Sequence, residues 1–340
     1  MANQIATVNG IAIASIANIN GITDANLAKL NGREFTGVVP YSGITWSTDD
    51  TVPVAASYGI KFGNVGAQGY SNCNTYDSGV TGYHDTYEHN GSSWSTTGDC
   101  SVAHGVAGGG GTQSAAVIFG GWDGSDDSVT TEEYNGSTWS TGNNMVGGMA
   151  YGTGGGTLQT AQLCTGGSTY SPTVRNISLT QTYNGTNWSN ESVASDGRGS
   201  ATSGESGGGG LDAFLSASGS DTYDSTASQL FNQSGGSWTS KAACPTARRY
   251  TGSSTDGVRV YKIGGVNPNG GTGWTSQGNV ESWVENSWTT ENSMPVALTG
   301  PGLGSGGLES AEGSASSVGG SNPNASSGGD VNTYYIAAAS

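Results

Sequence analysis

The chain has 340 residues, of which 26 are acidic and 10 are basic, so its formal net charge is −16. We expect no nucleic-acid partner and no binding to anionic membranes, because the sequence has no basic stripe that could displace counterions. Its 60 glycines and 33 % hydrophobic residues predict a folded protein rather than a low-complexity chain. No apolar stretch is long enough to span a bilayer and no secretory signal is apparent, so we also expect no membrane insertion.

Residues 1–36 contain an 11-residue repeat whose copies end in Asn-Gly, as at residues 16–21 and 27–32. Each copy has two apolar residues three positions apart, a spacing that predicts one short helical turn. The apolar set is Ile5, Val8, Ile16, Ile19, Leu27 and Leu30. So short a segment cannot bury an apolar side by itself. We therefore predict that residues 1–36 form an anchor that packs against its own copies or against another protein.

From residue 37 onwards a longer unit recurs, and each copy contains a tryptophan that follows an aromatic residue and a short polar turn. The clearest copy runs from Tyr134 through Asn135 and Gly136 to Trp139. The six tryptophans, spaced by 45 to 50 residues, are Trp46, Trp94, Trp139, Trp188, Trp238 and Trp288. Asn-Gly between apolar residues is a strong hairpin signal, since both residues tolerate positive φ. A period of this length predicts repeated sheets round an axis, with the aromatic residues buried between neighbouring sheets.

Each unit also contains a glycine-rich strand and an apolar strand that ends in a glycine pair, such as residues 116–121. With the two hairpin strands this makes four strands per unit. The last unit, which includes residues 331–336, has no tryptophan strand, whereas residues 44–46 supply one near the start of the chain. An N-terminal strand that completes the last sheet leaves no open edge. We therefore predict an all-β chain in which residues 37–340 form one six-bladed β-propeller closed by this strand.

The glycine pair at residues 120–121, followed by Tyr134 and Trp139, resembles the kelch repeat of β-propellers. The resemblance implies a kelch-like propeller and says little about function. The unit near residue 218 departs from the pattern, because it lacks one glycine of the pair.

Two of the four cysteines occupy a repeated position. Cys100 and Cys244 each lie six residues after a repeat tryptophan, where other units have Met145 and Met294. A position filled by Cys or Met indicates a small buried pocket, so we predict that both cysteines are free core thiols.

The sequence contains none of the motifs of nucleophilic hydrolases, zinc proteases or dinucleotide-binding enzymes. We assign no catalytic, cofactor-binding or metal-ligating residue and predict that the protein is not an enzyme. One oxygen-rich loop holds Asp123, Asp126 and Asp127, carboxylates of the kind that Ca²⁺ binds. Because their spacing is not that of an EF-hand, we favour a solvated turn, with Ca²⁺ as the alternative.

Trp122 and Trp274 fall in loops between strands rather than at the hairpin position. Exposed aromatic rings beside small polar residues suit sugar stacking, and packing across the loops is the alternative. With Asp123, they form the candidate contact loops for a ligand.

The combination of an Asn-Gly repeat with a Gly- and Ser-rich propeller resembles structural or fibre-type proteins of tailed bacteriophages, particularly marine ones. The resemblance implies a non-enzymatic virion protein, a fibre or appendage component for host-surface attachment or particle decoration. Its partners would be its own copies or other virion proteins, bound through residues 1–36, and a glycan or protein of the host surface. The alternatives are a cellular kelch-type adhesin or scaffold and, with less support, a propeller hydrolase, lyase or oxidase.

Overall fold

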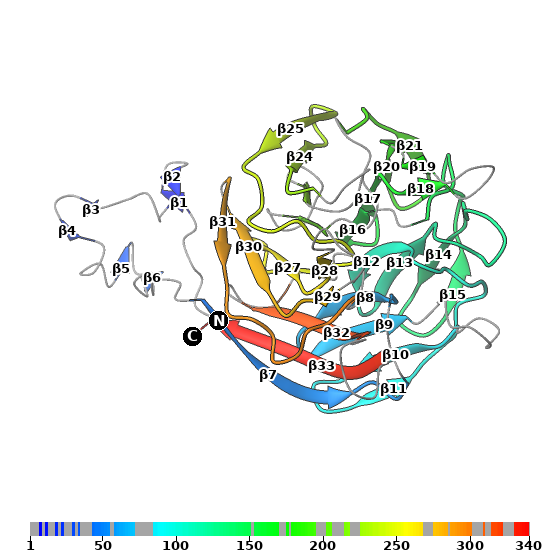
Figure 1. Cartoon of the computed structure of the whole chain (residues 1–340), viewed down its shortest axis with the longest axis horizontal. Coiled ribbons are helices and arrows are strands. Elements are labelled where there is room, and N and C mark those ends of the chain that lie inside the picture. Colours follow the sequence, from blue (N-terminus) through cyan, green and yellow to red (C-terminus); the bar gives the residue numbers. More distant parts are fainter. Residues whose placement is uncertain are drawn as a thin grey trace. The chain divides into compact units, whose positions relative to one another are not determined.

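In a computed structural model the chain divides into two compact units, one of Met1–Gly43 with Ala339–Ser340 and one of Ile44–Ala338 (Figure 1). The structure describes residues 7–8, 11–12, 18–19, 22–23, 29–30, 33–34, 43–54, 58–71, 84–150, 153–169, 175–176, 178–194, 202–205, 214–217, 225–267, 275–284, 286–300, 309, 314–321 and 330–339. The regular structure in these ranges is all-β, as predicted. Within them no helix has the length and hydropathy needed to cross a membrane.

The first unit contains three short antiparallel hairpins. Their two-residue strands are β1 (Thr7–Val8), β2 (Ile11–Ala12), β3 (Asn18–Ile19), β4 (Ile22–Thr23), β5 (Lys29–Leu30) and β6 (Arg33–Glu34). The two residues between the paired strands are Asn and Gly in all three hairpins. The predicted helical turns are therefore wrong. Asn-Gly favours a two-residue hairpin turn, and this local preference outweighs the three-residue spacing of the apolar pairs.

The second unit is a β-propeller (Figure 1). Its described residues form five antiparallel sheets of four strands each, with the strands of each sheet in chain order. The first sheet contains β8 (Ile60–Asn64), β9 (Ala67–Ser71), β10 (Thr86–His89) and β11 (Trp94–Thr96). The second contains β12 (Gly108–Thr112), β13 (Ala115–Phe119), β14 (Thr131–Tyr134) and β15 (Trp139–Thr141). The third contains β16 (Thr153–Leu158), β17 (Ala161–Thr165), β20 (Thr180–Tyr183) and β21 (Trp188–Asn190).

The two remaining four-stranded sheets follow the same order. They contain β22 (Thr202–Glu205), β23 (Phe214–Ala217), β24 (Ser228–Asn232) and β25 (Ser237–Lys241), and then β26 (Gly252–Thr255), β27 (Val260–Ile263), β30 (Val280–Val284) and β31 (Ser287–Thr290). Small hairpins extend two of the connections, β18 (Ser168–Thr169) with β19 (Arg175–Asn176) and β28 (Val266–Asn267) with β29 (Thr275–Ser276).

The closing sheet contains β32 (Ala315–Ser321), β33 (Asp330–Ala339) and β7 (Ile44–Thr51), in this order. It joins the earliest strand of the propeller to the last two. The predicted six blades of four strands are therefore corrected to five such blades and this three-stranded sheet, within the described residues. The sequence also has a glycine-rich stretch at residues 300–307 that would supply a fourth strand, and all of it except Gly300 lies outside the described residues.

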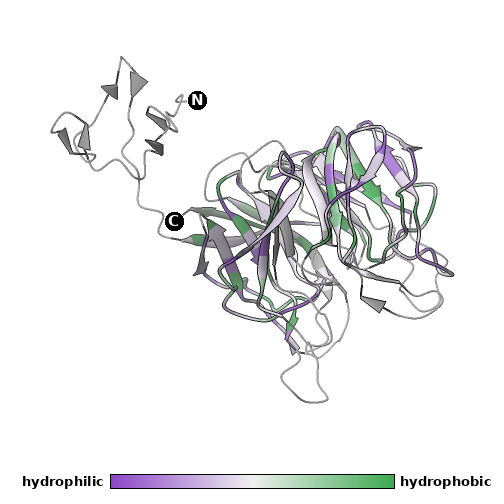
Figure 2. Ribbon diagram, turned by 90° about the horizontal axis from the view of Figure 1, so that it is seen from above, coloured by the Kyte–Doolittle hydropathy of each residue, from purple (hydrophilic) through white to green (hydrophobic). Residues whose placement is uncertain are grey.

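The glycine content is explained by the inner strands, which contact one another round the axis. A Cβ atom added to Gly110 in β12 would lie 2.4 Å from the carbonyl oxygen of Gly156 in β16. Only glycine allows the two backbones to approach this closely. The apolar core lies along the next strands, where Ile118 and Phe119 are completely buried (Figure 2).

Five of the six expected hairpins are present, those that end at Trp94, Trp139, Trp188, Trp238 and Trp288, and in each the aromatic pair is a direct cross-strand pair. Trp46 instead lies in β7, which pairs with β33. Tyr134 lies opposite Trp139, with ring centroids 5.0 Å apart. In the four-residue loop between them, the Oδ1 atom of Asn135 accepts hydrogen bonds of 3.0 Å from the backbone N–H groups of Ser137 and Thr138. Gly136 has a φ of 89°, which accounts for glycine at this position.

The repeat tryptophans are less uniformly buried than predicted. Trp94 and Trp188 are buried, whereas Trp139, Trp238 and Trp288 remain partly exposed beside the core. All five lie in the outermost strand of their sheet, so the position in the sheet alone does not decide how deeply each ring is buried.

Candidate functional site

The two ends of the propeller strands carry different connections. Because each four-stranded sheet is an antiparallel meander, the turns after its first and third strands lie at one end, which we call the turn end. The connection after the second strand and the connection to the next sheet lie at the other end, which we call the connection end. Backbone hydrogen bonds join these connections, as between Gly121 N and Met149 O (2.7 Å) and between Gly265 N and Leu298 O (2.7 Å).

A rim of left-handed residues precedes the inner strands at the connection end. Twelve positions after a repeat tryptophan, φ is 57° at Tyr58, 51° at Val106, 53° at Tyr250 and 58° at Gly300, and these four residues are the rim. The Tyr58 N–H donates to Gly300 O (3.0 Å), and the Gly300 N–H donates to Tyr250 O (2.9 Å). Bulky residues seldom adopt this conformation, so the linked connections hold both tyrosines in place against a local preference.

The predicted contact residue Trp122 lies beside this rim. Its backbone N–H donates to Gly105 O (2.8 Å) and its carbonyl accepts from Gly105 N (2.9 Å), so it is bridged to the residue directly before Val106. Its side chain is partly buried.

Asp123 is exposed next to Trp122 and organises a turn. Its Oδ1 atom accepts hydrogen bonds of 2.8 Å from the backbone of Ser125 and of Asp126 and from the Ser125 hydroxyl. The bond from the Asp126 backbone, with those from Ser125, lowers the pKa of the Asp123 carboxyl. Among the residues that the structure describes, no three His, Cys, Asp or Glu side chains converge as a metal site. Asp123 is therefore the acceptor of a turn, and Ca²⁺ at this loop stays the alternative prediction.

Several predicted residues lie outside the described residues. They are Trp274 in the contact loops and Ile5, Ile16 and Leu27 in the anchor. The other anchor residues, Val8, Ile19 and Leu30, are the last residues of β1, β3 and β5, directly before each Asn-Gly pair.

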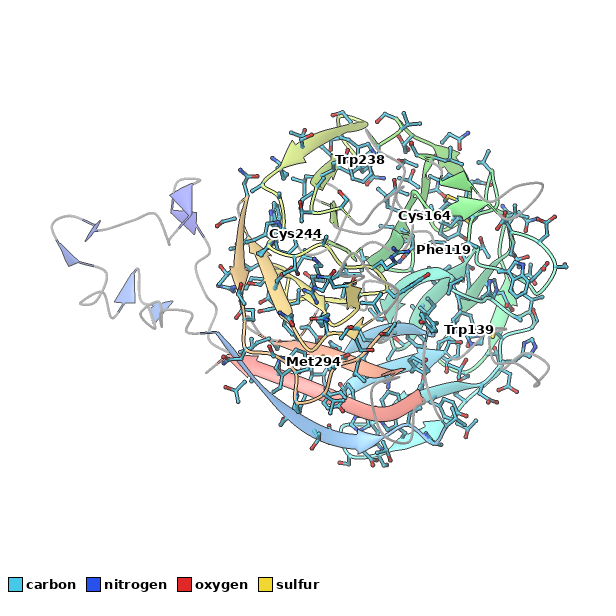
Figure 3. All side chains as sticks on the ribbon, in the orientation of Figure 1. Phe119, Trp139, Cys164, Trp238, Cys244 and Met294 are labelled. Atoms are coloured by element: carbon cyan, nitrogen blue, oxygen red, sulfur yellow. The ribbon has the colours of Figure 1, made fainter. Side chains whose placement is uncertain are left out.

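The position six residues after each tryptophan is buried, as predicted, at Cys100, Met145, Cys244 and Met294. Figure 3 labels Cys244 and Met294 among these. Cys244 is a free thiol, which confirms that part of the prediction. Cys100 is disulfide-bonded, so the prediction of a free thiol is wrong there. The burial of Cys100 follows from the repeat, whereas the repeat contains no information on its disulfide partner.

Buried charges, which the sequence did not reveal, hold one connection against β14. His104 and Glu132 are both buried, and Nε2 of His104 lies 3.0 Å from Oε2 of Glu132. The carboxylate also accepts from the backbone N–H groups of Ser101 (2.8 Å) and Val102 (3.2 Å). Burial alone would raise the pKa of Glu132, but hydrogen bonds from His104 and Ser101 outweigh it and lower that pKa to about 2.

The same arrangement recurs in other sheets with different residues. Oε1 of Gln181 accepts from the backbone N–H groups of Val146 (2.7 Å) and Gly147 (3.1 Å), at the same offsets from a tryptophan. Oε1 of Glu281 accepts from the Thr246 hydroxyl (2.5 Å). Because this contact between a strand side chain and a connection recurs in three sheets, it stabilises the propeller fold and does not indicate a single catalytic site.

Around Glu281 the charges are denser. Its Oε2 atom lies 3.2 Å from Nη2 of Arg248 and 3.1 Å from Nζ of Lys262, and all three residues are buried. Burial, followed by the nearby Arg248 charge, lowers the pKa of Lys262. Nζ of Lys262 also lies 3.3 Å from Sγ of Cys244.

A third buried cluster joins the first sheet to the closing sheet. Nζ of Lys61 donates to the carbonyl and the hydroxyl of Ser316 (2.9 and 3.0 Å) and lies 3.9 Å from Oε1 of Glu309. Oε1 of Glu309 also accepts from the hydroxyl of Ser254 (2.7 Å) in β26. Burial lowers the pKa of Lys61 to about 8 against the opposing charge of Glu309. These charges link three sheets near the axis.

A signal for the buried clusters existed in the sequence. His104 and Arg248 both lie ten residues after a repeat tryptophan, and Glu132 and Glu281 both lie two residues before a hairpin aromatic. Comparing polar residues at fixed offsets would have paired these positions.

No protein-family description and no curated protein matches this chain. Among solved structures it is similar to YjhT, with a TM-score of 0.65 and 13 % sequence identity over 84 % of this chain and 95 % of that chain. At such low identity the similarity supports the fold alone, a β-propeller.

Proposed function

We propose that the chain is a non-enzymatic component of a bacteriophage virion, a fibre or appendage that presents a β-propeller for host-surface attachment or particle decoration. The proposal rests on the separation of the chain into two structural units. Three Asn-Gly hairpins form a unit of their own, and the propeller closes without them through β7. A unit of two-residue strands has too little structure to be stable alone, which suits a segment that orders against other copies or against a particle.

One further observation supports an extracellular location, and another supports a non-enzymatic role. Cys100 is disulfide-bonded, and disulfides persist in oxidising surroundings. The buried His104–Glu132 and Arg248–Glu281 pairs hold connections to strands, so neither offers an exposed acid or base to a substrate.

Mass spectrometry of density-purified particles from the producing culture tests this proposal. We expect peptides of the chain at a constant ratio to the major capsid protein through successive gradients, and antibody label on intact particles. Recovery only with the host cells, as for an adhesin or scaffold, would overturn it.

A further inference from the structure

Aromatic residues in the connections of the propeller gather at one end. Within the described residues, the Tyr and Trp residues that lie between propeller strands are Tyr58, Trp122 and Tyr250, and all three belong to segments of the connection end. The segments of the turn end contain no Phe, Tyr or Trp. The segments of the connection end are also longer, such as residues 120–130 between β13 and β14 against residues 113–114 between β12 and β13, so they offer more positions for an exposed aromatic side chain.

Tyr58 and Tyr250 form the best-defined part of this surface. Their rings meet edge to face, with centroids 5.7 Å apart and an interplanar angle of 87°. Both side chains are only partly buried, so each keeps ring surface toward solvent. A Cβ atom on Gly300 would lie 2.6 Å from the Tyr58 ring, so glycine at this rim position makes room for the tyrosine.

The left-handed backbone at Tyr58 and Tyr250 would be adopted more easily by glycine than by tyrosine. Glycine occupies the same rim position at residue 300 without strain, yet Tyr58 and Tyr250 adopt φ values of 57° and 53°. Unfavourable backbone conformations of this kind cluster at ligand-binding surfaces. Trp122, bridged to Gly105 beside the rim, adds a third partly buried aromatic residue at the same end.

The surroundings favour one class of ligand. A net charge of −16 opposes a polyanionic ligand. A protein partner would need a continuous apolar patch, whereas the large exposed hydrophobic residues among the described positions are the scattered Val146, Leu158, Val193 and Val258. The partly buried rings of Tyr58, Tyr250 and Trp122, the last of them directly before the Asp123 turn, instead suit the apolar face and hydroxyl groups of a sugar ring.

We propose that the connection end, with Tyr58, Trp122 and Tyr250, is a binding surface for a neutral glycan. The proposal deepens the attachment function and rests on it for the origin of the glycan, a host surface. Edge-to-face tyrosines fixed by their backbone present ring surface with little freedom to lose on binding.

The test is a glycan array of neutral, sialylated and sulfated oligosaccharides probed with the full chain, followed by calorimetric titration of the strongest neutral hit. Tyr58→Gly and Tyr250→Gly are the test variants, because glycine suits the left-handed backbone and removes only the ring. Val258→Ala, at an apolar residue of the turn end that is 40 % exposed, is the matched control. Thermal unfolding of each variant verifies the fold.

We expect binding to neutral glycans, a loss of affinity of at least tenfold in both glycine variants, and no change in Val258→Ala. A silent array, binding only to acidic glycans, equal affinity in all variants, or capture of a host protein with no glycan bound would each overturn the inference. If the chain is present on particles while the array is silent, the proposed function stands and only the glycan surface fails.

Discussion

The indole Nε1 of Trp188 donates a hydrogen bond of 2.9 Å to the hydroxyl of Thr131 in the preceding sheet. Trp139 makes the equivalent bond of 2.9 Å to Thr86. Within the described structure, Nε1 of Trp94 is buried and has no acceptor. The repeat tryptophans therefore differ in whether they join two sheets by a polar contact.

Trp188→Phe should destabilise the propeller more than Trp94→Phe. Both changes leave a similar cavity, but only Trp188→Phe removes a hydrogen bond and leaves the hydroxyl of Thr131 without this donor. We expect a difference of about 1–2 kcal/mol in the free energy of unfolding, measured by urea denaturation. Equal losses would show that the bond to Thr131 adds nothing.

Glu132 should make the protein sensitive to acid. Its pKa in the folded protein, about 2, is below the ordinary 4.5, so the stability it contributes is present above pH 4.5 and is lost as the pH falls toward 2. Glu132→Gln keeps an acceptor for the backbone of residues 101 and 102, as Gln181 does in the next sheet. Urea denaturation between pH 2.5 and 7 should show a shallower acid decline for the variant. An unchanged decline would assign the acid sensitivity to other groups.

Lys61 should give a second rise of stability with pH, at the alkaline end of the range. Its folded pKa of about 8 is below the ordinary 10.5, so the unfolded chain binds more protons and the free energy of unfolding rises with pH between these values. We expect a rise of about 2 kcal/mol between pH 8 and 10, which Lys61→Met should abolish. If the variant retains the rise, the buried lysine is not its source.

Replacing Gly66 and Gly185 by alanine should distinguish the stability cost of backbone strain from the cost of a steric clash. Gly185 and Gly66 both have a φ of 86°. A Cβ atom added at Gly185 would lie 2.7 Å from Cγ2 of Thr160, whereas a Cβ atom added at Gly66 would have no neighbouring atom within 4 Å. Gly66→Ala should cost about 1 kcal/mol, and Gly185→Ala about 1–2 kcal/mol more. Similar unfolding free energies for both variants would mean that the hairpin loop moves away from Thr160.

The fold could be predicted because its signals are local and repeated. The pair Tyr134 and Trp139, with the Asn-Gly loop between them, specifies one hairpin. The repeat of this motif every 45 to 50 residues predicts the same hairpin in the other sheets. The helical turns of residues 1–36 were wrongly predicted because Val8 lies three residues after Ile5, a spacing that fits a helix. Val8 also lies directly before an Asn-Gly pair, and in the structure it pairs with Ile11 across a hairpin. The turn chemistry decides between the two.

The site was harder to predict because it depends on which connections meet. Trp122 and Asp123 stood out by residue type, and Asp123 proves to organise a turn. The rim at Tyr58 and Tyr250 escaped notice because these residues are 192 positions apart in the sequence. Only closure of the sheets round an axis, through Gly300, brings them together.

The central claim is that residues 1–36 direct assembly while the propeller folds without them. Its most direct test is sedimentation velocity, with thermal unfolding, of the full chain and of a variant that lacks residues 2–33. The deletion leaves β7, which begins at Ile44, and so leaves the closing sheet intact. We predict that the full chain sediments as an oligomer, and that the shortened chain is a monomer with the same unfolding temperature. Assembly of the shortened chain to the same size, or unfolding of its propeller, would contradict the account.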